Sequence, residues 1–244
     1  MFLPALLLAQ TSDYSRGVAL FDKGEFAAAV PYLKRAASEH GDDARAWKAL
    51  GVAYAAQNLY NEAEPPLRLA CEMDPKLLDA CYFFARTLYA LDRFEPSLKV
   101  LERIAPKSWK VRVAAGQSLE ALGKGPEAER ELRAALAESQ SASPQPGTAL
   151  GLFLVRQGRY DEAVGPLEEC VRQHPAAADP QLHLGRALME QGKLAAAIPH
   201  LERAVALNGR SAQAHLLLAR AYMRMGRTAD AQPHFDAAAQ GARE

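Results

Sequence analysis

The sequence has few cysteines, no excess of charge of either sign and no apolar run long enough to cross a bilayer. Its 244 residues contain three cysteines, which is too few for the disulfide framework of a small secreted domain. Lysine plus arginine and aspartate plus glutamate both number 29, so the net charge is zero. A neutral chain lacks the general basic surface that neutralises phosphates. We therefore expect neither a nucleic-acid partner nor a membrane span.

The three cysteines are Cys71, Cys81 and Cys170. We expect each of them to be a buried, unpaired side chain that packs as a small hydrophobe. Cys71 and Cys81 are close in sequence, and the alternative is that they pair if the protein is exported.

The N-terminal residues 1–9 are the only compositionally biased segment. Phe2 to Ala9 are eight apolar residues, which fit the core of a short signal peptide with cleavage after Ala9. No lysine or arginine precedes them, so a cap packed on the first helix is the alternative. A signal peptide would place the protein in a bacterial periplasm or cell envelope, and a cap would leave it in the cytoplasm.

Motifs of catalysis and metal binding are also missing. The six histidines form no His-x3-His pair and have no Cys-x2-Cys neighbours, so no metal site is expected. The sequence has neither a G-x-S-x-G elbow nor a glycine loop of the kind that binds phosphates. We therefore expect no catalytic residues, no cofactor and no enzyme. The alternative is an enzyme whose active site lies in a groove between repeats.

What the sequence does contain is one unit repeated seven times. A glycine or alanine recurs at steps of 34, 34, 31, 35, 34 and 34 residues, at Gly17, Gly51, Ala85, Gly116, Gly151, Gly185 and Ala219. A large apolar residue follows each of them at nearly constant distance, at Leu33, Leu67, Leu101, Leu132, Leu167, Leu201 and Phe235. The small residue predicts a place where a second helix packs closely through the large one.

Each unit predicts two helices joined by a tight turn. Residues that tolerate a left-handed backbone mark the turns, at Gly24, Asn58, Asp92, Gly123, Gly158, Gly192 and Gly226. Prolines follow most of these turns, and we expect each second helix to begin just before its proline, at Pro31, Pro65, Pro66, Pro166, Pro199 and Pro233. One helix pair buries too little apolar surface to be stable alone, so neighbouring units must stack.

The repeat resembles the tetratricopeptide repeat. The signature W-x2-L-G-x2-Y, followed by Ala, a large apolar residue, Ala and Pro, is matched by Trp47, Leu50, Gly51, Tyr54, Ala63, Leu67, Ala70 and Pro75. The resemblance covers about residues 10–240. It implies an all-α fold, a right-handed superhelical solenoid of antiparallel helix pairs.

The repeats divide the sequence into three parts after residues 1–9. We expect repeats one to four in residues 10–138, a connection rich in Ser and Pro in 139–147, and repeats five to seven in 148–244. The connection belongs to the segment Ala137 to Thr148, which is interpreted either as a hinge or as a rigid corner.

The resemblance also implies a concave groove lined by the first helix of each repeat, where a peptide or partner segment binds. Carried over position by position, the expected groove residues are Tyr14, Lys48, Val52, Tyr82, Arg86, Tyr89, Gln117, Leu152, Leu182, Arg186, Met189, Leu216, Arg220, Met223 and Arg224. The family's chaperone clamp uses Lys and Asn on these helices. Here Lys48 is followed one turn later by Val52, so a chaperone tail is not the expected partner.

Arginines give this groove its expected character. Arg86, Arg186 and Arg220 occupy equivalent places in their repeats, and an arginine there can hold a carboxylate through two hydrogen bonds. We expect a protein or extended peptide partner that is acidic or offers a free carboxylate. The alternative is that Asp79, Glu120 and Glu190 neutralise the basic residues within the protein.

The sequence thus predicts a non-catalytic scaffold for protein–protein interaction or complex assembly. The alternative function is a self-associating module, because no further repeat covers the last helix and Phe235 with Ala237 to Ala239 would then lie exposed. That alternative predicts a homodimer formed through the C-terminal helix.

Overall fold

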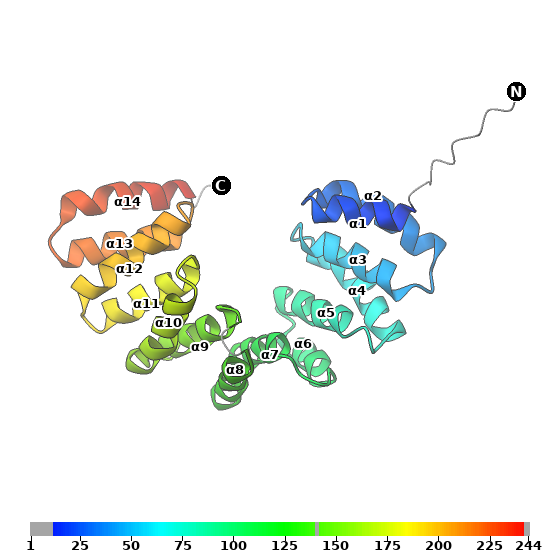
Figure 1. Cartoon of the computed structure of the whole chain (residues 1–244), viewed down its shortest axis with the longest axis horizontal. Coiled ribbons are helices and arrows are strands. Elements are labelled where there is room, and N and C mark those ends of the chain that lie inside the picture. Colours follow the sequence, from blue (N-terminus) through cyan, green and yellow to red (C-terminus); the bar gives the residue numbers. More distant parts are fainter. Residues whose placement is uncertain (1–11, 140–141, 242–244) are drawn as a thin grey trace, which may run out of the picture. The chain divides into compact units, whose positions relative to one another are not determined.

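The computed structural model describes residues 12–139 and 142–241, and within these ranges the protein is all-α (Figure 1). The expected signal peptide or cap at residues 1–9 lies outside the described residues. Fourteen helices are described: α1 Asp13–Asp22, α2 Phe26–Glu39, α3 Ala44–Ala55, α4 Tyr60–Met73, α5 Leu78–Ala90, α6 Phe94–Glu102, α7 Trp109–Ala121, α8 Gly125–Ser139, α9 Gln145–Arg156, α10 Tyr160–Gln173, α11 Ala178–Glu190, α12 Leu194–Leu207, α13 Ala212–Arg224 and α14 Thr228–Gly241.

The helices form seven pairs, each joined by the turn that the sequence predicts. The turn residue has a positive φ in every pair, from 58° at Asp92 to 79° at Gly24. Five of the seven are glycine, which takes this conformation without a steric penalty, and the other two are Asn58 and Asp92, which tolerate it. The seven predicted turns are therefore confirmed.

Close packing inside each pair explains the repeated glycine. A Cβ atom built on Gly51 in α3 would lie 2.4 Å from Cγ of Leu67 in α4. Gly151 in α9 has the same relation to Leu167 in α10, also at 2.4 Å. The predicted contact between the small residue of the first helix and the leucine of the second is confirmed in the five repeats that have glycine at this position.

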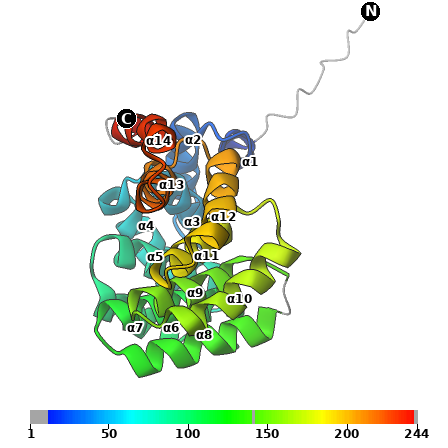
Figure 2. The same cartoon turned by 90° about the vertical axis from the view of Figure 1, so that its left-hand side faces the viewer.

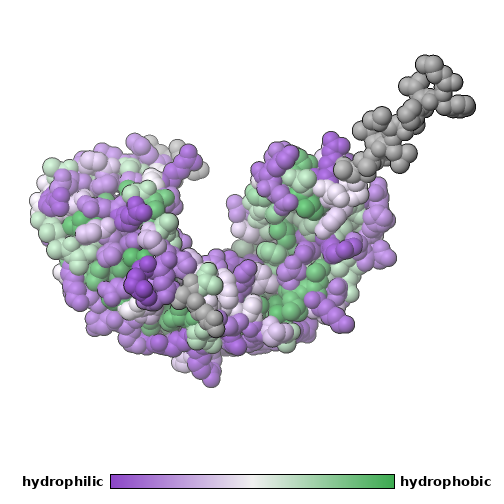
Figure 3. Space-filling view, in the orientation of Figure 1, coloured by the Kyte–Doolittle hydropathy of each residue, from purple (hydrophilic) through white to green (hydrophobic). Residues whose placement is uncertain are grey.

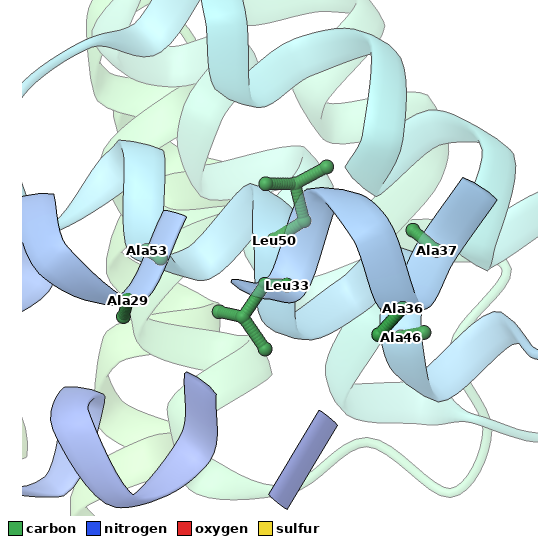
Figure 4. Packing of buried hydrophobic residues seen from close by; sticks show 7 residues of the cluster. All are labelled: Ala29, Leu33, Ala36, Ala37, Ala46, Leu50 and Ala53. Atoms are coloured by element: carbon green, nitrogen blue, oxygen red, sulfur yellow. The ribbon is translucent and has the colours of Figure 1, made fainter. Parts of the chain in front are cut away.

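The core continues from one pair to the next. Buried side chains of α2 and α3 form one cluster, which Figure 4 shows from close by: Ala29, Leu33, Ala36, Ala37, Ala46, Leu50 and Ala53. Trp47 and Tyr54 of the signature pack against it and are partly buried. Because α2 belongs to the first pair and α3 to the second, this apolar contact between neighbouring repeats stabilises the array.

The prolines lie deeper in the second helices than expected. α2 begins at Phe26 and α12 at Leu194, whereas Pro31 and Pro199 lie inside these helices. The sequence predicted helix starts directly before the prolines, and the starts lie more than one turn earlier. A proline at this depth removes one backbone hydrogen bond, and Pro31 and Pro199 are both exposed to solvent.

The described chain forms two compact units. Unit 1 consists of residues 12–107 with 121–123, and unit 2 of residues 108–120 with 124–241. In unit 1 the consecutive helices α1 to α6 pack on one another, and in unit 2 the helices α8 to α14 do so (Figures 1 and 2). The boundary therefore lies near residue 107, where repeat three is shortened, and not in the connection 139–147. Within that connection α9 already begins at Gln145, and α8 and α9 are in contact.

The cysteines differ from the expectation. Cys71 at the end of α4 and Cys81 in α5 form a disulfide bond, so the interpretation of these two as unpaired hydrophobes was wrong. The sequence separation of 10 residues allowed either outcome, and the turn between the two helices brings the side chains together. Cys170 in α10 is buried and free, and burial raises the pKa of its thiol.

Candidate functional site

The candidate site is the set of first helices, one from each pair. All the residues expected in the groove lie on them: Tyr14 on α1, Lys48 and Val52 on α3, Tyr82, Arg86 and Tyr89 on α5, Gln117 on α7, Leu152 on α9, Leu182, Arg186 and Met189 on α11, and Leu216, Arg220, Met223 and Arg224 on α13. In unit 1, α3 contacts both α1 and α5, and in unit 2, α11 contacts both α9 and α13. Each unit therefore carries its own row of three adjacent first helices.

Two of these residues are part of the interior of unit 2. Leu182 is only 6% exposed and Met189 only 3% exposed. Both side chains are buried, so they offer a partner almost no surface. On the same row Leu152 and Leu216 are half-buried and Met223 is exposed, which leaves apolar surface on α9 and α13.

The aromatic residues of the site lie on α1 and α5 of unit 1, and all three are half-buried. Tyr89 packs its ring edge-on against Phe94 of α6, with the ring centroids 5.2 Å apart, and Tyr82 packs against Phe83 with centroids 5.6 Å apart. Tyr14 packs against the cluster between α2 and α3. These rings are therefore held in place by contacts within unit 1.

The basic residue of α3 is neutralised within unit 1. Nζ of Lys48 lies 2.7 Å from Oδ2 of Asp79 on α5, and the lysine side chain is mostly buried. The sequence offered Asp79 as one of the residues that could neutralise the groove, and for Lys48 it does so. Arg86 is exposed about two turns further along α5.

In unit 2 the acidic residue Glu120 pairs with an arginine that the sequence analysis missed. Nη1 of Arg156 on α9 lies 3.2 Å from Oε2 of Glu120 on α7, so this ion pair joins two first helices. Arg156 follows Leu152 by four residues and therefore lies on the same face of α9. That spacing is the signal that could have identified it.

Arg186 and Arg220 have no such partner. Neither side chain makes an ion pair or a hydrogen bond with any residue that the structure describes. Arg186 on α11 is half-buried and Arg220 on α13 is exposed, and each follows the small residue of its own repeat directly. Nη1 of Arg224 donates to the carbonyl oxygen of Met189 at 3.0 Å, which ties α13 to α11 and leaves the charge of Arg224 without a carboxylate partner. The row formed by α11 and α13 is therefore the basic part of the site.

A buried histidine lies beside this basic surface. His183 on α11 is 7% exposed, and burial lowers its pKa to about 4, with a further contribution from Arg186 and Arg156. Asp179 acts in the opposite direction. The Nδ1 atom of His183 is buried and has no hydrogen-bond partner within the described part of the chain. His183 is thus a neutral imidazole at pH 7.

The last helix is more polar on its exposed side than the sequence suggested. Ala231 is buried in α14 and Phe235 is half-buried, whereas the exposed positions include Asp230, Gln232, Asp236 and Gln240. Nδ1 of His234 on α14 lies 2.9 Å from Nδ1 of His215 on α13, which ties the last helix to the one before it. The exposed side of α14 therefore carries several polar side chains beside exposed alanine and proline.

The described residues contain neither a metal-binding cluster nor a membrane span. Within residues 12–139 and 142–241, no cluster of three or more His, Cys, Asp or Glu side chains could hold a metal ion. None of the helices found there is both long enough and apolar enough to cross a membrane.

Solved structures show the same fold. A chain of the Cut9–Hcn1 hetero-tetramer of the APC/C matches 98% of this chain with a TM-score of 0.77 and 19% identity, and this chain spans about half of it (48%). PilF of Pseudomonas aeruginosa matches 78% of this chain over 88% of its own, with a TM-score of 0.67 and 19% identity. MamA from AMB-1 matches 68% of this chain over 96% of its own, with a TM-score of 0.56 and 25% identity.

Sequence comparison identifies the family. No curated protein matches the chain. The tetratricopeptide repeat patterns match residues 14–77, 113–178, 148–211 and 188–244, which together are most of the sequence. The chain therefore belongs to the tetratricopeptide repeat family, whose repeats form scaffolds for protein–protein interaction.

Proposed function

We propose that the protein is a non-catalytic scaffold that holds an acidic, partly apolar segment of a partner protein on the row formed by α9, α11 and α13 of unit 2. The observation that carries this proposal is the pair Arg186 and Arg220. They lie at the same position of two adjacent first helices and make no ion pair with the described residues. Lys48 and Arg156, by contrast, already have carboxylate partners at 2.7 and 3.2 Å.

The chemistry of an arginine row favours a carboxylate. The planar guanidinium group donates two parallel hydrogen bonds to one carboxylate, and such charge-assisted bonds are roughly twice as strong as neutral ones. Repeats six and seven each offer one arginine at this position, so two Asp or Glu side chains spaced along an extended segment would each meet one guanidinium. Leu152, Leu216 and Met223 supply apolar surface beside them for the partner's apolar side chains.

The structural relatives agree with an assembly role in general terms. Cut9 is found in a hetero-tetramer with Hcn1. That association is a property of Cut9, and for this chain it supports binding to a protein partner without identifying one.

A peptide titration tests the proposal. The probes are labelled extended peptides that alternate Glu with Leu, and matched peptides in which every Glu is replaced by Gln. We expect the native protein to bind the Glu peptides more tightly. Arg186→Glu with Arg220→Glu should weaken that binding by at least about a hundredfold, because two charge-assisted contacts are lost at about 1.5–3 kcal/mol each.

The matched control reverses the same amount of charge elsewhere in unit 2. Arg130 on α8 and Arg203 on α12 are exposed and lie on second helices. Arg130→Glu with Arg203→Glu should leave the affinity nearly unchanged. If both double variants weaken peptide binding equally, the loss of affinity comes from the change in net charge alone, and the proposed site is wrong.

Export of the protein is proposed as well. The Cys71–Cys81 bond supports it, because disulfides persist mainly in oxidising compartments. Rapid alkylation of thiols in cells that make the protein should find Cys71 and Cys81 blocked. If both react as free thiols there, the proposal of an oxidising compartment is wrong.

A further inference from the structure

The outer face of α4 in unit 1 is unlike that of the other second helices. Pro65, Leu69 and Met73 follow one another at intervals of four residues, so they form a stripe along the helix. All three are exposed, with 36% of Leu69 and 36% of Met73 accessible to solvent. We call these three residues the α4 stripe. Purple polar surface predominates in Figure 3, and the apolar patches shown in green stand out against it.

The other repeats show what normally occupies these positions. The residues equivalent to Leu69 in repeats one, three, five and six are all charged: Arg35, Arg103, Glu169 and Arg203. Those equivalent to Met73 in repeats one, four and five are Glu39, Glu138 and Gln173. The repeat therefore requires no apolar side chain here. Repeats four and seven have alanine at the position of Leu69, and repeat six has Leu207 at the position of Met73, but no other repeat has large apolar residues at both positions. Exposed apolar surface of this kind is typical of a contact surface.

A cavity opens beside the stripe, between α3 and α4. Its volume is about 520 Å³, and its lining is mostly apolar: Trp47, Leu50, Tyr54, Pro65, Pro66 and Leu69, with the stems of Arg68 and Glu72. A side chain of a docked partner can enter this cavity. The stripe and the cavity together offer a ridge next to a hollow, which is the geometry of helix-to-helix packing.

The charges next to the stripe indicate the occupant. Arg68 and Glu72 are both exposed on α4, and neither makes an ion pair or hydrogen bond with another residue in the described ranges. Opposite charges on one face make that face complementary to itself. If two copies of α4 cross antiparallel around a two-fold axis at the level of Ala70, Arg68 of each copy meets Glu72 of the other.

We propose that the protein forms a two-fold symmetric dimer in which α4 packs antiparallel against α4 of a second copy. The α4 stripes contact each other at the centre, and two Arg68–Glu72 ion pairs flank them. This surface is separate from the arginine row of unit 2, so the dimer does not depend on the proposed function. It also differs from the dimer through the C-terminal helix that the sequence suggested.

The first test changes the stripe without disturbing the fold. Leu69→Arg places in repeat two the residue that repeats one, three and six already carry, so the variant should fold. Analytical ultracentrifugation of the oxidised full-length protein over a wide concentration range should show a dimer for the native protein and a monomer for Leu69→Arg. The control Ala134→Arg makes the same change at the equivalent position of repeat four and should leave the dimer intact.

The second test exchanges the charges. Arg68→Glu alone and Glu72→Arg alone each place like charges opposite each other twice, and each should raise the dimer dissociation constant by at least about tenfold. The double variant Arg68→Glu with Glu72→Arg restores both pairs in reverse and should recover the native constant. A native protein that is monomeric at every concentration overturns the proposal. A dimer that survives Leu69→Arg, or a double variant that stays as weak as the single ones, overturns it too.

Discussion

Unit 1 and unit 2 are built from the same helix pair, but the side chains that each adds to this framework differ. Unit 1 contains the Cys71–Cys81 bond, and its one histidine, His40, is exposed. Unit 2 contains a free cysteine, Cys170, and buries His183 deeply. Both units use the same contact between glycine and leucine. The signature residues therefore determine the packing, while residues outside the signature determine how each unit responds to redox conditions, pH and ligands.

The largest expected effect tests what the units share. Gly51→Val in unit 1 and Gly151→Val in unit 2 each place a side chain where a Cβ would lie 2.4 Å from a leucine Cγ. Each variant should lower the free energy of unfolding of its own unit by about 3 kcal/mol through overpacking. Amide hydrogen exchange of the full chain, followed peptide by peptide, measures the two units separately.

A matched control is available in α10. Gly165 is helical and exposed, and a Cβ built on it meets nothing within 4 Å, so Gly165→Val should change stability only slightly. If Gly51→Val and Gly151→Val differ widely in their effects, the two units do not share one packing rule.

Reduction of the disulfide should affect unit 1 alone. The bond closes a loop with a sequence separation of 10 residues, and the chain-entropy relation gives about 2–3 kcal/mol for a loop of this size. Reductant, or Cys71→Ser with Cys81→Ser, should therefore increase hydrogen exchange in α4 and α5 and leave unit 2 unchanged. An equal change in both units would mean that they unfold together.

Acid should destabilise unit 2 preferentially. The folded-state pKa of His183 is about 4, whereas its ordinary value is 6.5, so the unfolded chain takes up the proton first. The contribution of His183 to the stability of unit 2 is therefore complete above its ordinary pKa of 6.5. It decreases as the pH falls below that value and stops decreasing below about pH 4. Between about pH 8 and about pH 5 this single group should remove about 2 kcal/mol from unit 2. Burial also lowers the pKa of His200 and of His234, which adds to the same trend.

A single substitution isolates the contribution of His183. Repeat seven carries Leu217 at the equivalent position, so His183→Leu should fold and should flatten the pH dependence of unit 2. Chemical denaturation at several pH values, followed by hydrogen exchange in peptides of unit 2, measures how the free energy of unfolding of unit 2 changes with pH. A slope unchanged by the substitution would assign the acid sensitivity to another group.

The sequence predicted the framework well because the framework is local and periodic. The seven turn residues and the contacts of the five glycines with their leucines recur at steps of about 34 residues, and each can be recognised within one repeat. The boundary between the units near residue 107 was not predicted from the sequence. Ser- and Pro-rich composition in 139–147 left a hinge and a rigid corner as alternatives, and α8 and α9 are in contact there.

The ion pairs of the site could not be predicted from the repeat pattern, because they join residues of different repeats. Lys48 meets Asp79 from the next repeat, 31 residues away, and Glu120 meets Arg156, 36 residues away. Leu182 and Met189 lie on the helices that the repeat pattern predicts, but both are buried. A position in the repeat predicts which helix face a residue occupies, and its neighbours decide whether a partner can reach it.

The measurement that tests the central claim most directly is the affinity of one Glu- and Leu-containing peptide for three proteins at constant ionic strength. These are the native chain, the variant with Arg186→Glu and Arg220→Glu, and the control with Arg130→Glu and Arg203→Glu. We predict that only the first double variant loses affinity for the peptide, by at least about a hundredfold. If the native chain does not prefer this peptide to its Gln counterpart, or if both double variants lose it equally, the arginine row of unit 2 is not the binding site.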